Sequence, residues 1–404
     1  MDKFRTYERW CRLLVLLVAS MQILFVSVRG FAPSLGRSLR RIEPFHRATG
    51  LRKISRSGLP PLGAKSSDRD SRKAKEAVAD YKETGMSPLA DYENPSNRDD
   101  QVFSAISEDG SVKVTACTAR NLVNDLMIMH TLTAVPADAI GRTAVCALMM
   151  SNGMQAEQTC QITLNADGPL RGVVAISDGV GHVKAYVGSP MVGDIELPEA
   201  VGKGMVQVVK NHPDWNNPYN GITAIRHGDI DRDIGAYLAE SEQRSCALAA
   251  GISVNGILCT AAGGYLIEQL PNATPETLSR VEKNLGKLVE KDGGNKLPTG
   301  LLLKGVTPLE IAETILDGLG MVPLQQISPE FECKCSSDRL IRALRLIPRS
   351  EVDEILESEE KIEARCEFCG TTYRMGPEEI RKELDNAEGD PSLDSDFEES
   401  QKKE

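Results

Sequence analysis

The stretches Phe331-Glu-Cys-Lys-Cys335 and Cys366-Glu-Phe-Cys-Gly370 place four cysteines in two tight pairs, C-x-C and C-x-x-C, with thirty residues between the pairs. Two such pairs separated by a helical-looking segment can bring four thiolates to one tetrahedral ion, and zinc is the ion that four-sulfur sites of this kind hold. The spacing therefore predicts one Zn²⁺ per chain. The predicted ligands are Cys333, Cys335, Cys366 and Cys369.

The same four thiolates could act as a redox switch or as a static structural support. An oxidant that takes electrons from a sulfur removes a metal ligand, and metal loss costs roughly 10 to 16 kcal/mol of binding energy in small zinc modules. Spacing alone leaves both interpretations open. Redox catalysis by C-x-x-C alone is disfavoured, because that motif normally opens a helix, whereas Gly370-Thr-Thr-Tyr-Arg374 is typical of a turn and a short strand.

At these residues the chain resembles the heat-shock protein 33 family of redox-regulated holdase chaperones. The resemblance spans roughly residues 101–378, with the motifs in the family's order. Upstream it rests on Asp167-Gly-Pro-Leu-Arg-Gly172, Tyr186-Val-Gly-Ser-Pro190, Ser241-Glu-Gln243 and Gly264-Tyr-Leu-Ile267.

The resemblance implies an ATP-independent chaperone that is inactive while reduced and zinc-bound. It implies that oxidation with mild unfolding releases zinc, that Cys333 then pairs with Cys335 and Cys366 with Cys369, and that the activated form dimerises. The partners implied are unfolded client proteins, which the activated chaperone would protect from aggregation under oxidative and heat stress.

Charge argues against the main rival, a zinc-ribbon-like nucleic-acid-binding protein. Residues 1–65 hold 13 Lys/Arg against 3 Asp/Glu, a net charge of +10. Because the whole chain has a net charge of −11, the rest of it carries −21. A nucleic-acid-binding site would need a basic, aromatic-bearing surface, but residues 331–378 are mildly acidic. We therefore expect no nucleic-acid partner.

The sequence also gives no sign of an enzyme, although an enzyme with an accessory zinc tail is a third interpretation. It contains no G-x-S-x-G, H-E-x-x-H or phosphate-loop motif, and we predict no catalytic residue and no other cofactor. The histidines are scattered and none falls near the cysteine cluster along the chain, which favours four sulfur ligands. They are His46, His130, His182, His212 and His227.

The first 65 residues predict targeting. Residues 1–30 follow a signal-peptide plan, with basic residues ahead of an apolar run at 13–28; a membrane-spanning helix is the weaker alternative. Residues 31–65 open with Phe31-Ala-Pro33 and are rich in Ser and Arg, which resembles the two-part presequence of algae with secondary plastids. We expect the plastid stroma, with no membrane association after processing. Secretion is the alternative, but a zinc-thiolate switch needs a reducing compartment.

Five further units follow along the chain. We predict a disordered linker at 66–100, an α+β core domain at 101–271, a helical linker at 272–330, the zinc domain at 331–378, and a helix end with an acidic disordered tail at 379–404. In the core, short strands at 158–166, 170–177 and 182–187 predict an antiparallel meander, and the helices are expected at 121–132, 139–150 and 229–242. Residues 214–221 are expected to form a polar loop.

Five cysteines in the core lie in apolar or strand contexts, where a free cysteine behaves as a small hydrophobe. We assign them no redox role, although Cys160 falls on a possible edge strand. They are Cys117, Cys146, Cys160, Cys246 and Cys259.

The helical linker is the second informative segment. Thr274-Pro275 and Thr307-Pro308 each supply a cap followed by proline, and Glu310 completes a capping box, which predicts helices at 275–290 and 308–316. The stretch between them, opening at 292–298, is expected to be flexible. The apolar second helix could be a docked connector, or it could pack on the core only while the zinc domain holds it. The family resemblance implies the second.

Overall fold

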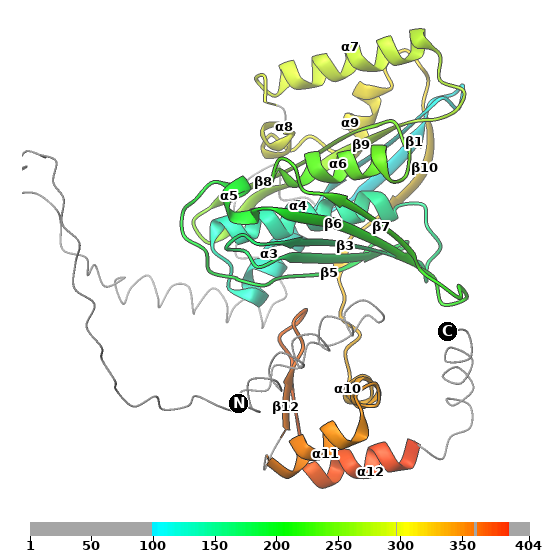
Figure 1. Ribbon diagram of the computed structural model, residues 1–404. Coiled ribbons are helices and arrows are strands. Elements are labelled where there is room, and N and C mark those ends of the chain that lie inside the picture. The colour runs from blue at the N-terminus through cyan, green and yellow to red at the C-terminus, as the bar shows by residue number, and fades with distance from the viewer. Residues whose placement is uncertain (1–98, 296, 359–361, 388–404) are drawn as a thin grey trace, which may run out of the picture.

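The computed structural model describes residues 99–295, 297–358 and 362–387 (Figure 1). The predicted signal peptide, the transit segment, residues 66–98 of the predicted linker and the acidic tail from 388 lie outside these residues. Within the described part, no helix is long and apolar enough to cross a membrane. Asp100, at the end of the predicted linker, is buried, and its Oδ2 accepts a 2.8 Å hydrogen bond from the Leu122 N–H. The folded core therefore begins before residue 101.

One sheet is five-stranded and antiparallel, in the order β10-β1-β2-β9-β8. The alternation of Val112, Val114 and Ala116 predicts a half-buried strand. The strand is present, but both of its faces are buried, because Thr115 and Cys117 are buried as well. Gly263 lies where the backbone of Cys117 approaches so closely that a side chain would clash with its carbonyl. The strands are β1 (Val102–Ile106), β2 (Val112–Thr118), β8 (Cys246–Asn255), β9 (Leu258–Gln269) and β10 (Val322–Ile327).

The other large sheet is six-stranded, in the order β11-β5-β4-β3-β6-β7. The predicted meander forms its centre, and every neighbouring pair is antiparallel except β11 with β5. The expectation of a polar loop at 214–221 is wrong from residue 219 on, where β7 begins. The strands are β3 (Thr159–Ala166), β4 (Val173–Asp178), β5 (His182–Val187), β6 (Gly204–Asn211), β7 (Tyr219–Ala224) and β11 (Glu330–Phe331).

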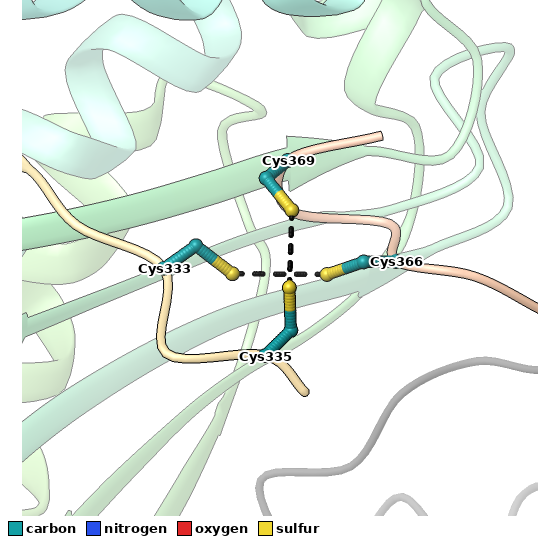
Figure 2. Close-up of side chains that lie close together, drawn as sticks. All are labelled: Cys333, Cys335, Cys366 and Cys369. Atoms are coloured by element: carbon teal, nitrogen blue, oxygen red, sulfur yellow. Dashed lines mark hydrogen bonds between the residues drawn. The ribbon is translucent and has the colours of Figure 1, made fainter. Parts of the chain in front are cut away.

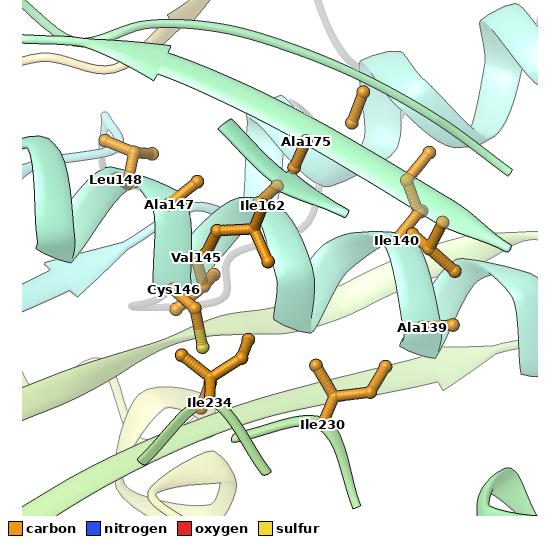
Figure 3. Packing of buried hydrophobic residues seen from close by; sticks show 14 of the residues in the cluster. Ala139, Ile140, Val145, Cys146, Ala147, Leu148, Ile162, Ala175, Ile230 and Ile234 are labelled. Atoms are coloured by element: carbon orange, nitrogen blue, oxygen red, sulfur yellow. The ribbon is translucent and has the colours of Figure 1, made fainter. Parts of the chain in front are cut away.

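The main core lies between the two sheets and around helix α4 (Ala134–Ser151), which contacts strands of both. This helix is apolar on nearly all sides, as expected of one with no solvent face. Figure 3 shows Cys146 and Val145 of α4 packed in one cluster with Ile162 of β3 and Ile234. The other helices of the core are α3 (Arg120–His130), α5 (Leu197–Val201) and α6 (Ile230–Glu240).

Three linker helices cover the outer face of the five-stranded sheet (Figure 1). The side chain of Thr274 accepts from the Thr277 N–H, and the capping box of Thr307 and Glu310 is present as predicted. A short helix begins just after the stretch 292–298 that is expected to be flexible, and its residues Leu301 and Leu302 are buried against the sheet. The helices are α7 (Pro275–Lys291), α8 (Thr299–Leu303) and α9 (Pro308–Ile315).

The C-terminal module has a small hydrophobic core of its own, built around Leu340, Leu344, Val352 and Ile380. Ser336 caps its first helix by accepting from the Arg339 N–H. The module also contains a two-stranded sheet. Together with the two large sheets and their helices, it gives the chain the predicted α+β fold. The elements are α10 (Ser337–Leu344), α11 (Arg349–Ser358), β12 (Ile362–Arg365), β13 (Thr372–Met375) and α12 (Pro377–Ala387).

Candidate metal centre

Two loops of the C-terminal module carry the predicted ligands. Cys333 and Cys335 lie between β11 and α10, and Cys366 and Cys369 lie in the turn between β12 and β13. In this turn the Gly370 N–H donates to the Cys366 carbonyl at 2.8 Å. Gly370 has φ 70°, a left-handed conformation that glycine adopts at least cost. Figure 2 shows the sulfurs of both loops pointing toward a common centre.

The distances between the sulfurs suit a metal ion. Cys333 Sγ lies 3.7 Å from Cys366 Sγ, Cys335 Sγ lies 3.3 Å from Cys369 Sγ, and all four sulfurs lie within 4.8 Å of one another. A tetrahedral ion bound at about 2.3 Å to each sulfur would hold them about 3.8 Å apart, whereas a disulfide needs about 2.05 Å. The four cysteines are free thiols in this structure and could hold a metal ion together.

Hydrogen bonds set the protonation of one sulfur pair. The Cys333 thiol and the N–H groups of Cys369 and Phe368 hydrogen-bond to Cys366 and lower its pKa to about 5. The same contact with Cys366 raises the pKa of Cys333. The lowered pKa favours the thiolate form of Cys366, which is the form that binds metal.

Two hydroxyl groups border the other pair. Tyr373 Oη donates to Cys335 Sγ at 3.1 Å, and Thr371 Oγ1 lies 3.2 Å from Cys369 Sγ. Burial is the largest influence on Cys369 and raises its pKa. Hydroxyl donors oppose that effect once the sulfur is ionised, because they stabilise its negative charge.

The C-x-x-C loop also touches the core domain. The ring of Phe368 packs edge-on against Tyr186 of β5, and Lys184 Nζ lies 4.9 Å from the centroid of the Phe368 ring. Burial lowers the pKa of Lys184, and attraction to the sulfurs of Cys333 and Cys366 opposes that shift. A partly buried cation therefore lies beside the sulfur cluster.

One histidine is closer to the cluster than the sequence suggested. His130 lies at the end of α3, and its Nε2 is 3.0 Å from the carbonyl oxygen of Ala185. The His130 ring also hydrogen-bonds to the backbone of Phe368. Burial nevertheless lowers the pKa of His130. Among the described residues the ligand group at this place contains sulfur atoms only, so His130 borders the centre from the core side.

The five core cysteines lie apart from the centre as free thiols. Burial raises the pKa of each one, which disfavours the reactive thiolate form. The suggestion that Cys160 lies on an edge strand is wrong. It is fully buried in β3, which pairs with β4 on one side and β6 on the other.

Sequence reasoning missed the contacts that the core makes with the centre. Their signal was the alternation in β5, where Val183, Ala185 and Val187 are buried, while the residues between them are half-buried and polar or aromatic. Such a strand presents a second face that something else covers. Here Phe368 of the C-x-x-C loop covers part of it, by packing against Tyr186 and Lys184. The missed residues are His130, Lys184, Tyr186 and Phe368.

Comparison with known proteins agrees with this fold and site. The family model described as Hsp33 protein matches residues 100–376, more than half of the chain. The 33 kDa chaperonin of Clostridioides difficile is 32% identical over 293 residues, which cover 70% of this chain and 97% of that protein. The 33 kDa chaperonin of Nostoc sp. is 32% identical over 291 residues, 70% of this chain and 94% of that protein.

A solved structure shares the fold. The crystal structure of the 33 kDa chaperonin of Thermotoga maritima aligns with a TM-score of 0.62 at 22% identity, covering 72% of this chain and all of that one. The matched family region, the α+β fold and the cluster of four cysteines agree with one another. This chain belongs to the Hsp33 family of chaperones.

Proposed function

We propose that the protein is a redox-regulated, ATP-independent holdase that acts without catalytic turnover. In this proposal the ion is Zn²⁺, bound by the four cysteines of the C-terminal module while they are reduced. The same cysteines sense the oxidant. Zinc is the ion that four thiolates in tetrahedral geometry favour, and the sulfur distances above suit it.

The observation that supports the proposal most strongly is the route of the chain from the linker helices to the cysteine ligands. After α9, strand β10 pairs with β1 at the edge of one large sheet, and β11 pairs with β5 at the edge of the other. Cys333 follows two residues after β11. The linker helices are thus held at their C-terminal end by a segment that leads directly into the metal ligands.

Release of the linker helices from the core would expose apolar surface. Ile311 and Ile315 of α9 and Leu302 of α8 are buried against Val114 and other residues of the five-stranded sheet. Short helices of this kind draw their stability from packing rather than from their own sequence. Their separation from the sheet would expose two matching apolar surfaces, which is the type of surface that binds unfolded chains.

Energetics allow loss of the metal to act as a switch. A small hydrophobic core such as that of the C-terminal module rarely supplies more than about 3–5 kcal/mol, whereas structural zinc contributes roughly 10–16 kcal/mol. Loss of the ion would therefore unfold the module. With the module unfolded, β11 and β10 lose their anchor, and the linker follows.

The oxidation step is a two-electron reaction at each cysteine pair. Two thiolates give two electrons to one hydrogen peroxide molecule and form one disulfide, and with two protons the oxygen atoms leave as water. We propose the pairs Cys333 with Cys335 and Cys366 with Cys369, with release of Zn²⁺. The activated form would bind unfolded client proteins and form a homodimer.

Light scattering from a heat-aggregating client protein tests this function. The reduced, zinc-loaded chain should leave scattering unchanged, and the chain treated with peroxide at mildly raised temperature should suppress it. Substitution of Cys366→Ser should abolish the response to peroxide, while Cys246→Ser, outside the centre, should retain it. Equal scattering with reduced and oxidised protein would refute the switch and leave the metal centre as a structural support.

We further propose that residues 1–65 direct the chain to the plastid stroma. The support is the sequence pattern of a signal peptide followed by an acid-poor Ser/Arg-rich segment beginning at Phe31. A fluorescent protein fused after residue 65 should accumulate in the plastid of an alga with secondary plastids. A fusion lacking residues 1–30 should stay in the cytosol, and appearance of the full fusion in the medium would instead indicate secretion.

A further inference from the structure

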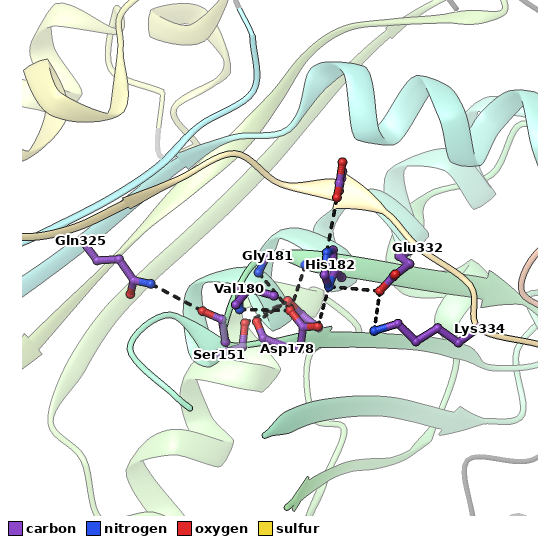
Figure 4. A network of polar contacts seen from close by, with 11 residues as sticks. Ser151, Asp178, Val180, Gly181, His182, Gln325, Glu332 and Lys334 are labelled. Atoms are coloured by element: carbon purple, nitrogen blue, oxygen red, sulfur yellow. Dashed lines mark hydrogen bonds and ion pairs between the residues drawn. The ribbon is translucent and has the colours of Figure 1, made fainter. Parts of the chain in front are cut away.

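A second group of metal-ligand side chains lies where the linker meets the core, apart from the four cysteines. Asp178 at the end of β4, His182 at the start of β5 and Glu332 just after β11 place their ligand atoms within 4.8 Å of one another. Figure 4 shows these side chains converging. Asp178 Oδ2 lies 2.8 Å from His182 Nδ1, and Glu332 Oε2 lies 3.0 Å from the same nitrogen.

The backbone fixes the positions of these groups. Asp178 Oδ1 accepts hydrogen bonds from the N–H groups of Val180, Gly181 and His182 at 3.1, 3.0 and 2.9 Å. Its other oxygen, Oδ2, is therefore directed at the imidazole. The Glu332 N–H donates to the Val183 carbonyl at 3.0 Å, which continues the parallel pairing of β11 with β5. The fold thus fixes the Asp178 carboxylate and places the backbone of Glu332 beside β5.

Two carboxylate oxygens lie close to one imidazole nitrogen, and either a protonated imidazole or a bound cation can supply the positive charge that stabilises them there. The other ring nitrogen, Nε2, lies 3.3 Å from Glu330 Oε1. If the proton of a neutral imidazole is on Nε2 and donated to Glu330, Nδ1 presents its lone pair to two carboxylate oxygens. A proton on Nδ1 can point at only one of the two, because a hydrogen bond is directional. A metal ion in the gap could bind all three atoms.

We propose that Asp178, His182 and Glu332 form a second divalent-cation site, with nitrogen and oxygen ligands in place of sulfur. One imidazole and two carboxylates suit Zn²⁺ or Mn²⁺. Glu330, on the far ring nitrogen, completes the carboxylate–histidine–metal arrangement that orients an imidazole ligand. Lys334 Nζ lies 2.8 Å from Glu332 Oε2 and would have to turn away, which its mostly exposed side chain allows.

The ion would join segments that are far apart in the chain. Asp178 and His182 belong to the β4–β5 hairpin, and Glu332 is the residue before Cys333. A cation bound here therefore fastens the beginning of the C-terminal module to the core domain through side chains, next to the backbone pairing of β11 with β5. This site does not depend on the proposed holdase function.

Manganese binding to the full chain tests the proposal. The reduced chain, with its cysteine centre first filled by one Zn²⁺, is titrated with Mn²⁺ while the electron paramagnetic resonance signal of free Mn²⁺ is recorded. Thiolates disfavour Mn²⁺, so the titration counts the nitrogen–oxygen site. We expect one Mn²⁺ per chain. His182→Gln and Glu332→Gln should remove this binding, and Glu330→Gln should weaken it by roughly 10- to 100-fold.

The controls separate a lost site from a lost fold. The exposed His227→Gln should bind Mn²⁺ like the unchanged chain, and every variant should keep one Zn²⁺ in its cysteine centre. Glu332→Gln preserves the side-chain shape and the backbone bond to Val183. The proposal is overturned if the unchanged chain binds no Mn²⁺, or if the His182→Gln and Glu332→Gln chains bind it as tightly. Because the readout is metal content, neither result bears on the holdase function.

Discussion

The ring of Phe368 meets the ring of Tyr186 edge to face, with centroids 5.0 Å apart and planes at 84°. Phe368 lies between Cys366 and Cys369, and Tyr186 lies in β5 of the core domain. This pair therefore connects the turn that carries two metal ligands to the sheet on which β11 is paired.

We predict that Phe368→Ala makes the metal centre easier to oxidise. Aromatic pairs of this geometry contribute about 0.5–1.5 kcal/mol, and the nearby Lys184 ammonium adds a cation–π contact. Without them the module should leave the core more often, and peroxide should release zinc several-fold faster. A colorimetric zinc chelator follows the release. Trp215→Ala, an exposed aromatic of the core, is the control, and an unchanged rate in Phe368→Ala would show that the pair has no influence.

A cavity under the linker should activate the protein without oxidant. Ile315 of α9 is fully buried against the five-stranded sheet, and Ile→Ala changes at such positions cost about 2–5 kcal/mol. The reduced, zinc-loaded Ile315→Ala chain should therefore suppress client aggregation in the scattering assay. Leu309→Ala alters the same helix at an exposed position and should remain inactive. Inactivity of both variants would contradict a metastable linker.

Metal removal should unfold the chain selectively. Chelation of the reduced protein should expose the backbone amides of α10, α11 and α12, and next those of α9, β10 and β11, to hydrogen exchange. The strands β3, β4 and β9 should stay protected, because they belong to the main sheets and their cores. Hydrogen-exchange mass spectrometry with and without zinc measures the difference. Loss of protection in all strands together would mean that the chain unfolds as one unit.

Asp100 should make stability depend on pH. Burial raises its pKa to about 6 from the usual 3.8. Between about pH 4 and pH 6, therefore, the folded chain holds a proton on Asp100 that the unfolded chain releases. Stability from this group is greatest below about pH 4 and falls as the pH rises to about 6. Asp100→Asn should gain free energy of unfolding relative to the unchanged chain over this range, by up to about 3 kcal/mol.

Urea unfolding at several pH values measures this gain, with the exposed neighbour Asp99→Asn as the control. A difference between Asp100→Asn and the unchanged chain that stays constant from pH 4 to 7 would contradict the assignment. The comparison of variants cancels any effect of acid on the metal centre itself.

Local signals in the sequence predicted most of the elements. Helices α7 and α9 begin where Thr274 and Thr307 supply caps, because such caps act within a few residues. Strands β3, β4 and β5 were predicted from alternation and short turns. By contrast, β10 was missed because it contains Pro323 and is largely exposed, and proline is tolerated in a strand only at an edge. Strand β7 is likewise an edge strand with mostly exposed residues.

The candidate site was predictable in part for the same reason. The spacing of the four cysteines predicts a shared site, and the structure brings all four together. The residues that border them come from α3 and β5, more than 140 positions earlier in the chain. No local pattern predicts that Lys184 or His130 lies beside Phe368, since that depends on how two parts of the chain with separate hydrophobic cores pack together.

The position of β10 and β11 has one more consequence. Between them these two short strands close one edge of each large sheet, β10 along β1 and β11 along β5. Their departure would leave two rows of unpaired backbone N–H and C=O groups. Every polypeptide carries the same groups whatever its side chains, so an unfolding protein could add itself as a new strand at either border. A chaperone opened in this way would recognise its clients by their main chain as well as by their apolar residues.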